Sequence, residues 1–207
     1  GKVDHMIKNI ILDVGKVLVE WDPKGAFEKI GLDEQTAKAV ADATINTSIW
    51  IETDRGVWSD EQILSALCEN APKYKEEVKK FWDHIDLAIE QFPYTKEWIS
   101  GMKKEGLHVY ILSNYGKKTF ELTKDTALDF LPLTDGAIFS YTVKQIKPDL
   151  EIYETLLNQY QLKPEECVFI DDRMENIEGA KKAGIHGICF ETIEQVKEDL
   201  KKYNVYA

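Results

Sequence analysis

Residues 7–22, IKNIILDVGKVLVEWD, decide how the rest of the sequence is interpreted. The run from Ile7 to Leu12 is short, mostly apolar and bounded by polar residues, which is typical of a buried strand. It ends on Asp13, and Gly15 follows two residues later. A carboxylate at the carboxyl end of a buried parallel strand stands where open α/β sheets bind their ligands. Aspartate also caps turns in such places, so this stretch alone leaves both interpretations open.

Strand-like and helix-like segments alternate from Thr95 to the end of the chain. Such alternation predicts a parallel sheet with right-handed crossovers and helices on both faces. The predicted fold class is therefore α/β, with a three-layer Rossmann-like core. The further strands are expected at about residues 107–112, 137–141, 167–170 and 187–190, with helices between them.

Between Pro23 and about Pro93 the strand-like signals almost vanish, and helical ones take over. Asp33 is predicted to cap a helix that ends near Ala43. Ser59 and Gln62 form an S-x-x-Q capping box for a helix that ends near residue 70. Another helix is expected over residues 75–85. This segment predicts a small helical domain inserted after the first strand.

Composition and charge narrow the class of protein. The 207 residues carry 37 acidic and 26 basic side chains, a net charge of −11, which disfavours nucleic acid and anionic membranes as partners. No apolar run is long enough for a membrane span, and no signal-peptide pattern opens the chain. We interpret Gly1–His5 as an expression remnant. Three cysteines without metal-type spacing indicate reduced thiols in a cytoplasmic protein.

Polar residues stand at the ends of three predicted strands and in a loop after another. They are Asp13, Ser113–Asn114, Asp171–Asp172 and Lys147. Each alone is also explained by capping or by a solvated loop. Because a parallel sheet directs its carboxyl ends toward one edge, we expect these side chains to share one site.

In the order quoted, the motifs LDVGKVLVEWD, LSN, IKPDLEIYE and FIDDRMENIEGAKKAGI resemble the haloacid dehalogenase superfamily. Their wording is most similar to the phosphatase branch that includes α-D-glucose-1-phosphate phosphatases. The resemblance implies a core domain of residues 6–20 and 93–207. It also implies a helical cap domain of the first (C1) type at residues 21–92.

The resemblance further implies a role for each motif residue. Asp13 is expected to be the nucleophile and to form an aspartyl-phosphate. Ser113 and the backbone N–H at Asn114 are expected to hold the phosphoryl oxygens, and Lys147 to add positive charge. Mg²⁺ is the expected cofactor, since it prefers oxygen ligands, with Asn176 orienting the carboxylates. The expected metal ligands are Asp13, the Gly15 carbonyl, Asp172 and, in an assisting role, Asp171.

One position departs from the family pattern. Most phosphatases of this superfamily carry a second aspartate two residues after the nucleophile, as the general acid for the leaving oxygen, and here that position is Gly15. The substrate can have a leaving oxygen that needs little protonation, such as that of a sugar 1-phosphate. Alternatively, another acid donates the proton, or the protein is a slow or inactive relative that only binds phosphometabolites. The candidate acids are Glu20, Asp22, Glu52 and Asp54.

The predicted function is a Mg²⁺-dependent phosphatase acting on a small phosphate monoester, plausibly a sugar phosphate such as a sugar 1-phosphate. A metal-independent 2-haloacid dehalogenase is the alternative enzyme, because that branch also lacks the second aspartate. The paired acids Asp171–Asp172 disfavour it, since they would repel a carboxylate substrate in a metal-free pocket. We expect a small phosphorylated substrate as the partner and a monomer or weak homodimer as the assembly.

Overall fold

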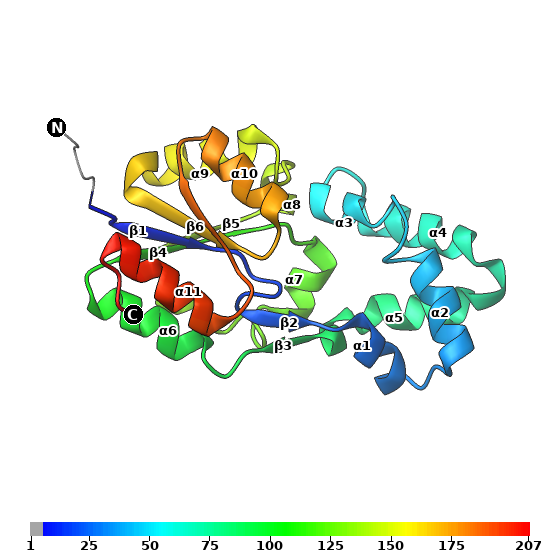
Figure 1. The fold of residues 1–207 in the computed structure, drawn as a ribbon. Coiled ribbons are helices and arrows are strands. Elements are labelled where there is room, and N and C mark those ends of the chain that lie inside the picture. Colours follow the sequence, from blue (N-terminus) through cyan, green and yellow to red (C-terminus); the bar gives the residue numbers. More distant parts are fainter. Residues whose placement is uncertain (1–5) are drawn as a thin grey trace.

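A central parallel sheet organises the protein (Figure 1). The computed structural model describes residues 6–207, and the expected expression remnant at Gly1–His5 lies outside them. The sheet has five strands in the order β5–β4–β1–β6–β7, and each neighbouring pair is parallel. These are β1 (Asn9–Leu12), β4 (His108–Ser113), β5 (Gly136–Phe139), β6 (Cys167–Asp171) and β7 (His186–Cys189). The predicted α/β class is confirmed, with strand ends shifted by one or two residues.

Helices cover both faces of this sheet and complete three layers (Figure 1). Alternate side chains of β1 point to opposite faces, so Ile10 and Leu12 belong to one hydrophobic cluster and Ile11 to the other. The first face is covered by α6 (Thr95–Lys104) and α11 (Ile193–Leu200), and the second by α9 (Leu150–Tyr160) and α10 (Met174–Lys182). β1 is therefore buried between two layers, and Asp13 follows it at the carboxyl edge of the sheet.

A two-stranded antiparallel ribbon connects the sheet to the inserted helices (Figure 1). It pairs β2 (Val19–Trp21) with β3 (Ile89–Gln91). β3 is not among the strands expected from the sequence. That strand has only three residues, and its partner lies about 70 positions away in the sequence. Three residues are too few to show the alternation of apolar and polar side chains by which a strand is recognised in a sequence.

The inserted helices have a hydrophobic core of their own. They are α1 (Pro23–Lys29), α2 (Glu34–Ala43), α3 (Ile51–Arg55), α4 (Asp60–Asn70) and α5 (Lys75–Asp83). Phe27, Leu67, Val78 and Phe81 are buried among these helices. The expected caps at Asp33 and Ser59 are present. The division into a core and a cap at residues 21–92 remains our interpretation. Within residues 6–207 the structure contains no helix with the length and apolar character that a membrane crossing requires.

Two close backbone approaches hold α3 against the core. Gly56 has a φ of 71°, and a Cβ there would collide with the backbone of Tyr141 in α8 (Ser140–Val143). A Cβ at Gly116, just before α7 (Lys117–Thr123), would lie 3.1 Å from the Thr53 carbonyl oxygen. These glycines allow α3 to lie over the carboxyl edge of the sheet.

The capping box of α4 gives a first stability prediction. Ser59 accepts a hydrogen bond from the Gln62 N–H at 3.1 Å, and the Gln62 side chain accepts one from the Ser59 N–H at 2.9 Å. We expect Ser59→Ala to lower the free energy of unfolding by about 1 kcal/mol, because the Gln62 N–H loses its hydrogen-bond acceptor. Urea unfolding measures this, and Ser65→Ala, at an exposed position in the same helix, is the control. Equal stabilities of the two variants would contradict the prediction.

Candidate active site

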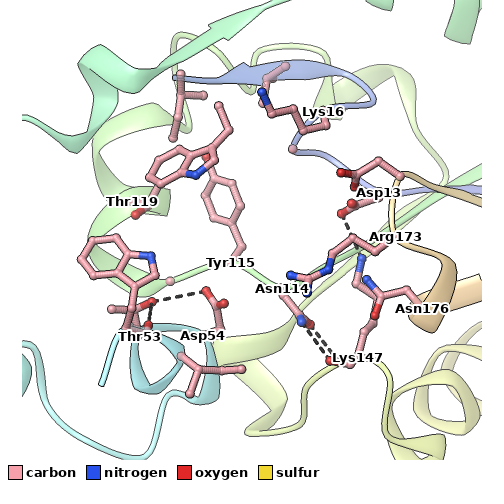
Figure 2. Close-up of a pocket in the computed structure, with 18 of the residues that line it drawn as sticks. Asp13, Lys16, Thr53, Asp54, Asn114, Tyr115, Thr119, Lys147, Arg173 and Asn176 are labelled. Carbon is pink, nitrogen blue, oxygen red and sulfur yellow. Dashed lines mark hydrogen bonds and ion pairs between the residues drawn. The ribbon is translucent and has the colours of Figure 1, made fainter. Parts of the chain in front are cut away.

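A cavity of about 350 Å³ lies at the carboxyl edge of the sheet, between the core and α3. The core contributes Asp13, Gly15, Asn114, Lys147, Asp172, Arg173 and Asn176 to its walls. The inserted segment contributes Trp50, Thr53 and Asp54, among others. Figure 2 shows Asp13, Asn114, Lys147, Arg173 and Asn176 on one side of an open centre, with Thr53 and Asp54 across from them. Residues from all four sequence motifs therefore meet at or beside one cavity.

Asp13 occupies the end of β1 with its carboxylate facing the cavity (Figure 2). The side chain is largely buried, with one oxygen accepting hydrogen bonds from the Val14 N–H at 2.8 Å and from Lys147 Nζ at 2.9 Å. Burial raises its pKa to about 7, Lys147 opposes this, and the nearby Asp171 carboxylate acts in the same direction as burial. The carboxylate is thus oriented by two donors on one oxygen.

Lys147 is the buried cation of the site. Its Nζ donates to Asp13 at 2.9 Å, to Asp171 at 2.8 Å and to the Leu112 carbonyl at 2.9 Å, which uses all three N–H bonds. Burial lowers the pKa of Lys147, but the two carboxylates more than offset this, so the pKa lies above its usual value. The ammonium therefore stays charged and fixed between the ends of β1, β4 and β6.

Asp171 and Asp172 differ in their surroundings. Asp171 is fully buried and accepts hydrogen bonds from Lys147, from the Arg173 N–H at 2.8 Å and from the Asn176 side chain at 3.1 Å. Asp172 is partly exposed and faces the cavity. Burial, followed by the charge of Asp171, raises the pKa of Asp172. The Asp171 carboxylate therefore positions Lys147, and the Asp172 carboxylate faces the cavity.

The donor set fits a hard divalent cation. Carboxylate oxygens of Asp13, Asp171 and Asp172 lie within 4.8 Å of one another. Three negative charges meet one ammonium, and among residues 6–207 no lysine or arginine forms an ion pair with Asp172. Mg²⁺ prefers such oxygen ligands and few protein groups. Gly15 lines the same cavity. The roles predicted for these four residues remain predictions.

The LSN motif is divided between two positions. Ser113 is buried at the end of β4, behind the walls of the cavity. Asn114 lines the cavity. Its side-chain oxygen accepts a hydrogen bond from the Lys147 N–H at 2.8 Å, and its side-chain nitrogen donates one to the Lys147 carbonyl at 3.1 Å. Asn114 thus ties the Lys147 loop to β4, a contact that the sequence did not predict. Binding of phosphoryl oxygens by Ser113 and the Asn114 N–H stays a prediction.

Two cations at the cavity were missed in the sequence. Lys16 follows Gly15 and forms an ion pair with Glu20, and Arg173 follows Asp172 and forms one with Glu175. Both line the cavity. Their position directly beside motif residues was the available signal. They add positive charge at the rim of an otherwise acidic site.

The four candidate acids are separated by the structure. Asp22 caps α1 by accepting from the Gly25 N–H, and Glu52 pairs with Arg55 at 3.4 Å. Glu20 lines the cavity, but the hydrogen bond from Lys16 lowers its pKa. Asp54 also lines the cavity, and burial raises its pKa to about 7.

The sequence profile of the haloacid dehalogenase-like hydrolases matches residues 7–184. The chain belongs to this family. The predicted resemblance is confirmed, and the match extends from the first strand through α10. The match includes the inserted helical segment as well as most of the core.

Among relatives in this family, a D-ribitol-5-phosphate phosphatase of Bacteroides thetaiotaomicron is 29% identical over 204 residues, covering 91% of this chain and 92% of the relative. A drimenol cyclase of Aspergillus calidoustus is 27% identical over 201 residues, but the chain spans only 36% of its length. The phosphatase relative supports the prediction of a phosphoric monoester hydrolase.

Solved structures of the same fold include a haloacid dehalogenase family enzyme from Bacteroides thetaiotaomicron in complex with magnesium and inorganic phosphate. The TM-score is 0.72 at 22% identity, covering 92% of this chain and 98% of that one. The two therefore share the haloacid dehalogenase-like fold over nearly their whole lengths.

Proposed function

We propose that this haloacid dehalogenase-like hydrolase is a Mg²⁺-dependent phosphatase that cleaves a small phosphate monoester through an aspartyl-phosphate on Asp13. The observation that carries this proposal is the grouping of Asp13, Lys147 and Asp172 at one cavity. Phosphoryl transfer needs positioning and charge neutralisation more than covalent help, and this grouping supplies both.

In the proposed reaction, the free oxygen of Asp13 attacks phosphorus in line with the leaving oxygen. The second Asp13 oxygen is held by Val14 and Lys147, which orients the carboxylate for attack. Lys147 balances charge on Asp13 and Asp171 within a buried setting, where electrostatic effects are strong. Backbone N–H groups at Asn114, before α7, are proposed to hold phosphoryl oxygens together with Ser113. Water then hydrolyses the aspartyl-phosphate.

Mg²⁺, held by Asp13, Asp171, Asp172 and the Gly15 carbonyl, would neutralise phosphate charge during transfer. Without a divalent cation, the dianionic substrate would enter a site with three carboxylates and one buried ammonium. The magnesium and phosphate bound by the related Bacteroides structure support this choice of metal.

The substrate is proposed to be a small sugar or polyol phosphate. The cavity of about 350 Å³ fits a ligand of this size, and the D-ribitol-5-phosphate phosphatase relative supports the class. Whether the protein prefers a sugar 1-phosphate, as its motif wording suggests, is tested by comparing 1-phosphates with 6-phosphates. Three free cysteines, two of them buried, fit the proposed cytoplasmic location. A monomer or weak homodimer remains the proposed assembly.

Metal removal tests the proposal directly. We expect phosphate release from a metabolite library to require Mg²⁺, to stop with excess EDTA and to return when Mg²⁺ is added back, because the acidic cluster alone repels the substrate. Malachite-green detection of phosphate measures this. A control with EDTA already saturated by Mg²⁺ separates chelation from inhibition by EDTA itself. Full activity in EDTA would contradict the proposal.

The dehalogenase alternative predicts the opposite behaviour. A 2-haloacid dehalogenase needs no metal and releases halide from a 2-haloacid, so its turnover would be unaffected by EDTA. The non-enzymatic alternative, a phosphometabolite-binding protein, predicts that wild type and Asp13→Asn release phosphate equally slowly. Either result would replace the phosphatase proposal.

A further inference from the structure

We propose that Asp54, on α3 of the inserted segment, is the general acid that protonates the leaving oxygen and then the base that activates water. This assignment rests on the proposed phosphatase function. It gives a catalytic role to a side chain on the inserted segment and explains how the reaction proceeds with a glycine at position 15.

The direction of attack brings the leaving oxygen toward Asp54. In an in-line displacement, the leaving oxygen lies on the side of phosphorus opposite the nucleophile. Asp13 stands on the core wall of the cavity, and Figure 2 shows Asp54 on the facing wall with its carboxyl group turned toward the centre. A phosphoryl group held against Asp13 therefore presents its ester oxygen to the wall that carries Asp54.

The other acidic side chains that line the cavity are engaged elsewhere. Glu20 is paired with Lys16, which favours its charged form, so it is a poor proton donor. Asp172 belongs to the acidic cluster on the same side as the nucleophile. Within the described part of the chain, the Asp54 carboxylate makes one side-chain hydrogen bond, a long one that it accepts from the Thr53 hydroxyl at 3.4 Å. Its carboxyl group is the one acid on the facing wall without an ion-pair partner among residues 6–207.

The surroundings of Asp54 favour the protonated form needed in a donor. Burial raises its pKa to about 7, and the more distant Lys147 opposes this. On its own helix, Glu52 and Arg55 are paired with each other. The charged groups of the cavity that face it from other elements are Asp13, Lys16, Glu20, Lys147, Asp172 and Arg173.

The backbone around Asp54 is held close to the core. Thr53, the preceding residue, contacts Gly116 at the start of α7, and Gly56 packs against the Tyr141 backbone in α8. Larger residues at either glycine would push α3 outward. The two glycine contacts therefore fix how far α3, and with it the Asp54 carboxyl group, lies from the core. A fixed position matters because a general acid must lie within hydrogen-bond reach of the oxygen that it protonates.

The proposed steps balance. An Asp13 oxygen forms a bond to phosphorus as the bond from phosphorus to the ester oxygen breaks, and Asp54 gives its proton to that oxygen, releasing a neutral alcohol. Asp54, now a carboxylate, accepts a proton from water as the water oxygen attacks phosphorus. The bond from phosphorus to Asp13 then breaks, which releases inorganic phosphate and restores both side chains.

The test compares two aryl esters whose leaving groups differ in acidity. For Asp54→Asn we expect kcat/KM for phenyl phosphate to fall by about 100-fold or more, with a much smaller change for p-nitrophenyl phosphate, whose leaving group needs little protonation. Because the variant also lacks the base, p-nitrophenol should appear in a burst followed by slow turnover. Glu52→Gln, on the same helix, is the matched control. It should not alter the ratio of kcat/KM between the two esters.

A second variant tests the link to position 15. A Cβ at Gly15 meets no atom within 4 Å, so a side chain can start there without a clash at its first atom. We expect Gly15→Asp, added to Asp54→Asn, to restore a large part of the phenyl phosphate activity. Equal losses on both esters, or no loss on either, would overturn the assignment. If wild type with Mg²⁺ releases phosphate neither from these esters nor from the metabolite library, the proposed phosphatase function fails, and this inference falls with it.

Discussion

Asp13→Asn is expected to lower phosphatase kcat by roughly 10⁴–10⁶-fold, because loss of a covalent nucleophile removes the reaction path itself. The same change should leave the free energy of unfolding unchanged or higher in metal-free protein. Burial raises the pKa of Asp13 to about 7, which means that the fold disfavours its charged form, and asparagine removes that charge. Steady-state phosphate release and urea unfolding measure the two effects.

If Asp13→Asn loses activity but keeps its stability, Asp13 is a catalytic residue and not a structural one. Asp125→Asn, at an exposed position between α7 and β5, is the matched control and should change neither property. An Asp13→Asn protein that retains more than a few per cent of the activity would show that another group attacks phosphorus. One that unfolds readily would show that the carboxylate holds the fold together.

Lys147→Met is expected to damage both activity and stability. Lys147 is 3% exposed, and its ammonium is the partner of Asp13 and Asp171, so its loss leaves two buried carboxylates without a cation. Removing one partner of a buried ion pair lowers the free energy of unfolding by about 3–5 kcal/mol. We also expect activity to fall by at least about 10³-fold, since the nucleophile loses a charged hydrogen bond that orients it.

The pH dependence of this loss gives a further check on its cause. Because the uncompensated carboxylates can bind protons in the folded variant, the stability deficit at neutral pH should shrink as the pH falls. Urea unfolding of wild type and Lys147→Met across pH measures this. Lys182→Met, an exposed lysine near the end of α10, is the control. A deficit that is the same at every pH would mean that lost packing, rather than charge, is responsible.

Much of the core could be predicted because its strands are buried on both faces. The run at Ile10–Leu12 and the run at Val168–Ile170 are apolar throughout, and the polar residue that ends each one stands at the edge where the cavity forms. The caps at Asp33 and Ser59 were equally readable, because a capping side chain bonds to an N–H only a few residues away.

Features that depend on distant partners escaped prediction. β3 exists because it pairs with β2 across the whole helical insertion. The Asn114 side chain reaches the Lys147 backbone, 33 positions along the chain, and no local pattern reports such a contact. The choice of Asp54 over Glu52 depends on which side of a five-residue helix faces the core, and α3 is too short for its sequence to fix that orientation.

Locating the phosphoryl group during turnover tests the central claim most directly. Wild-type protein with Mg²⁺ and p-nitrophenyl phosphate would be quenched in acid during turnover, digested and analysed by mass spectrometry. We predict a phosphate adduct on the peptide that contains Asp13, and no such adduct in Asp13→Asn. Substrate turnover with no adduct on Asp13, or with the adduct on another residue, would contradict the account.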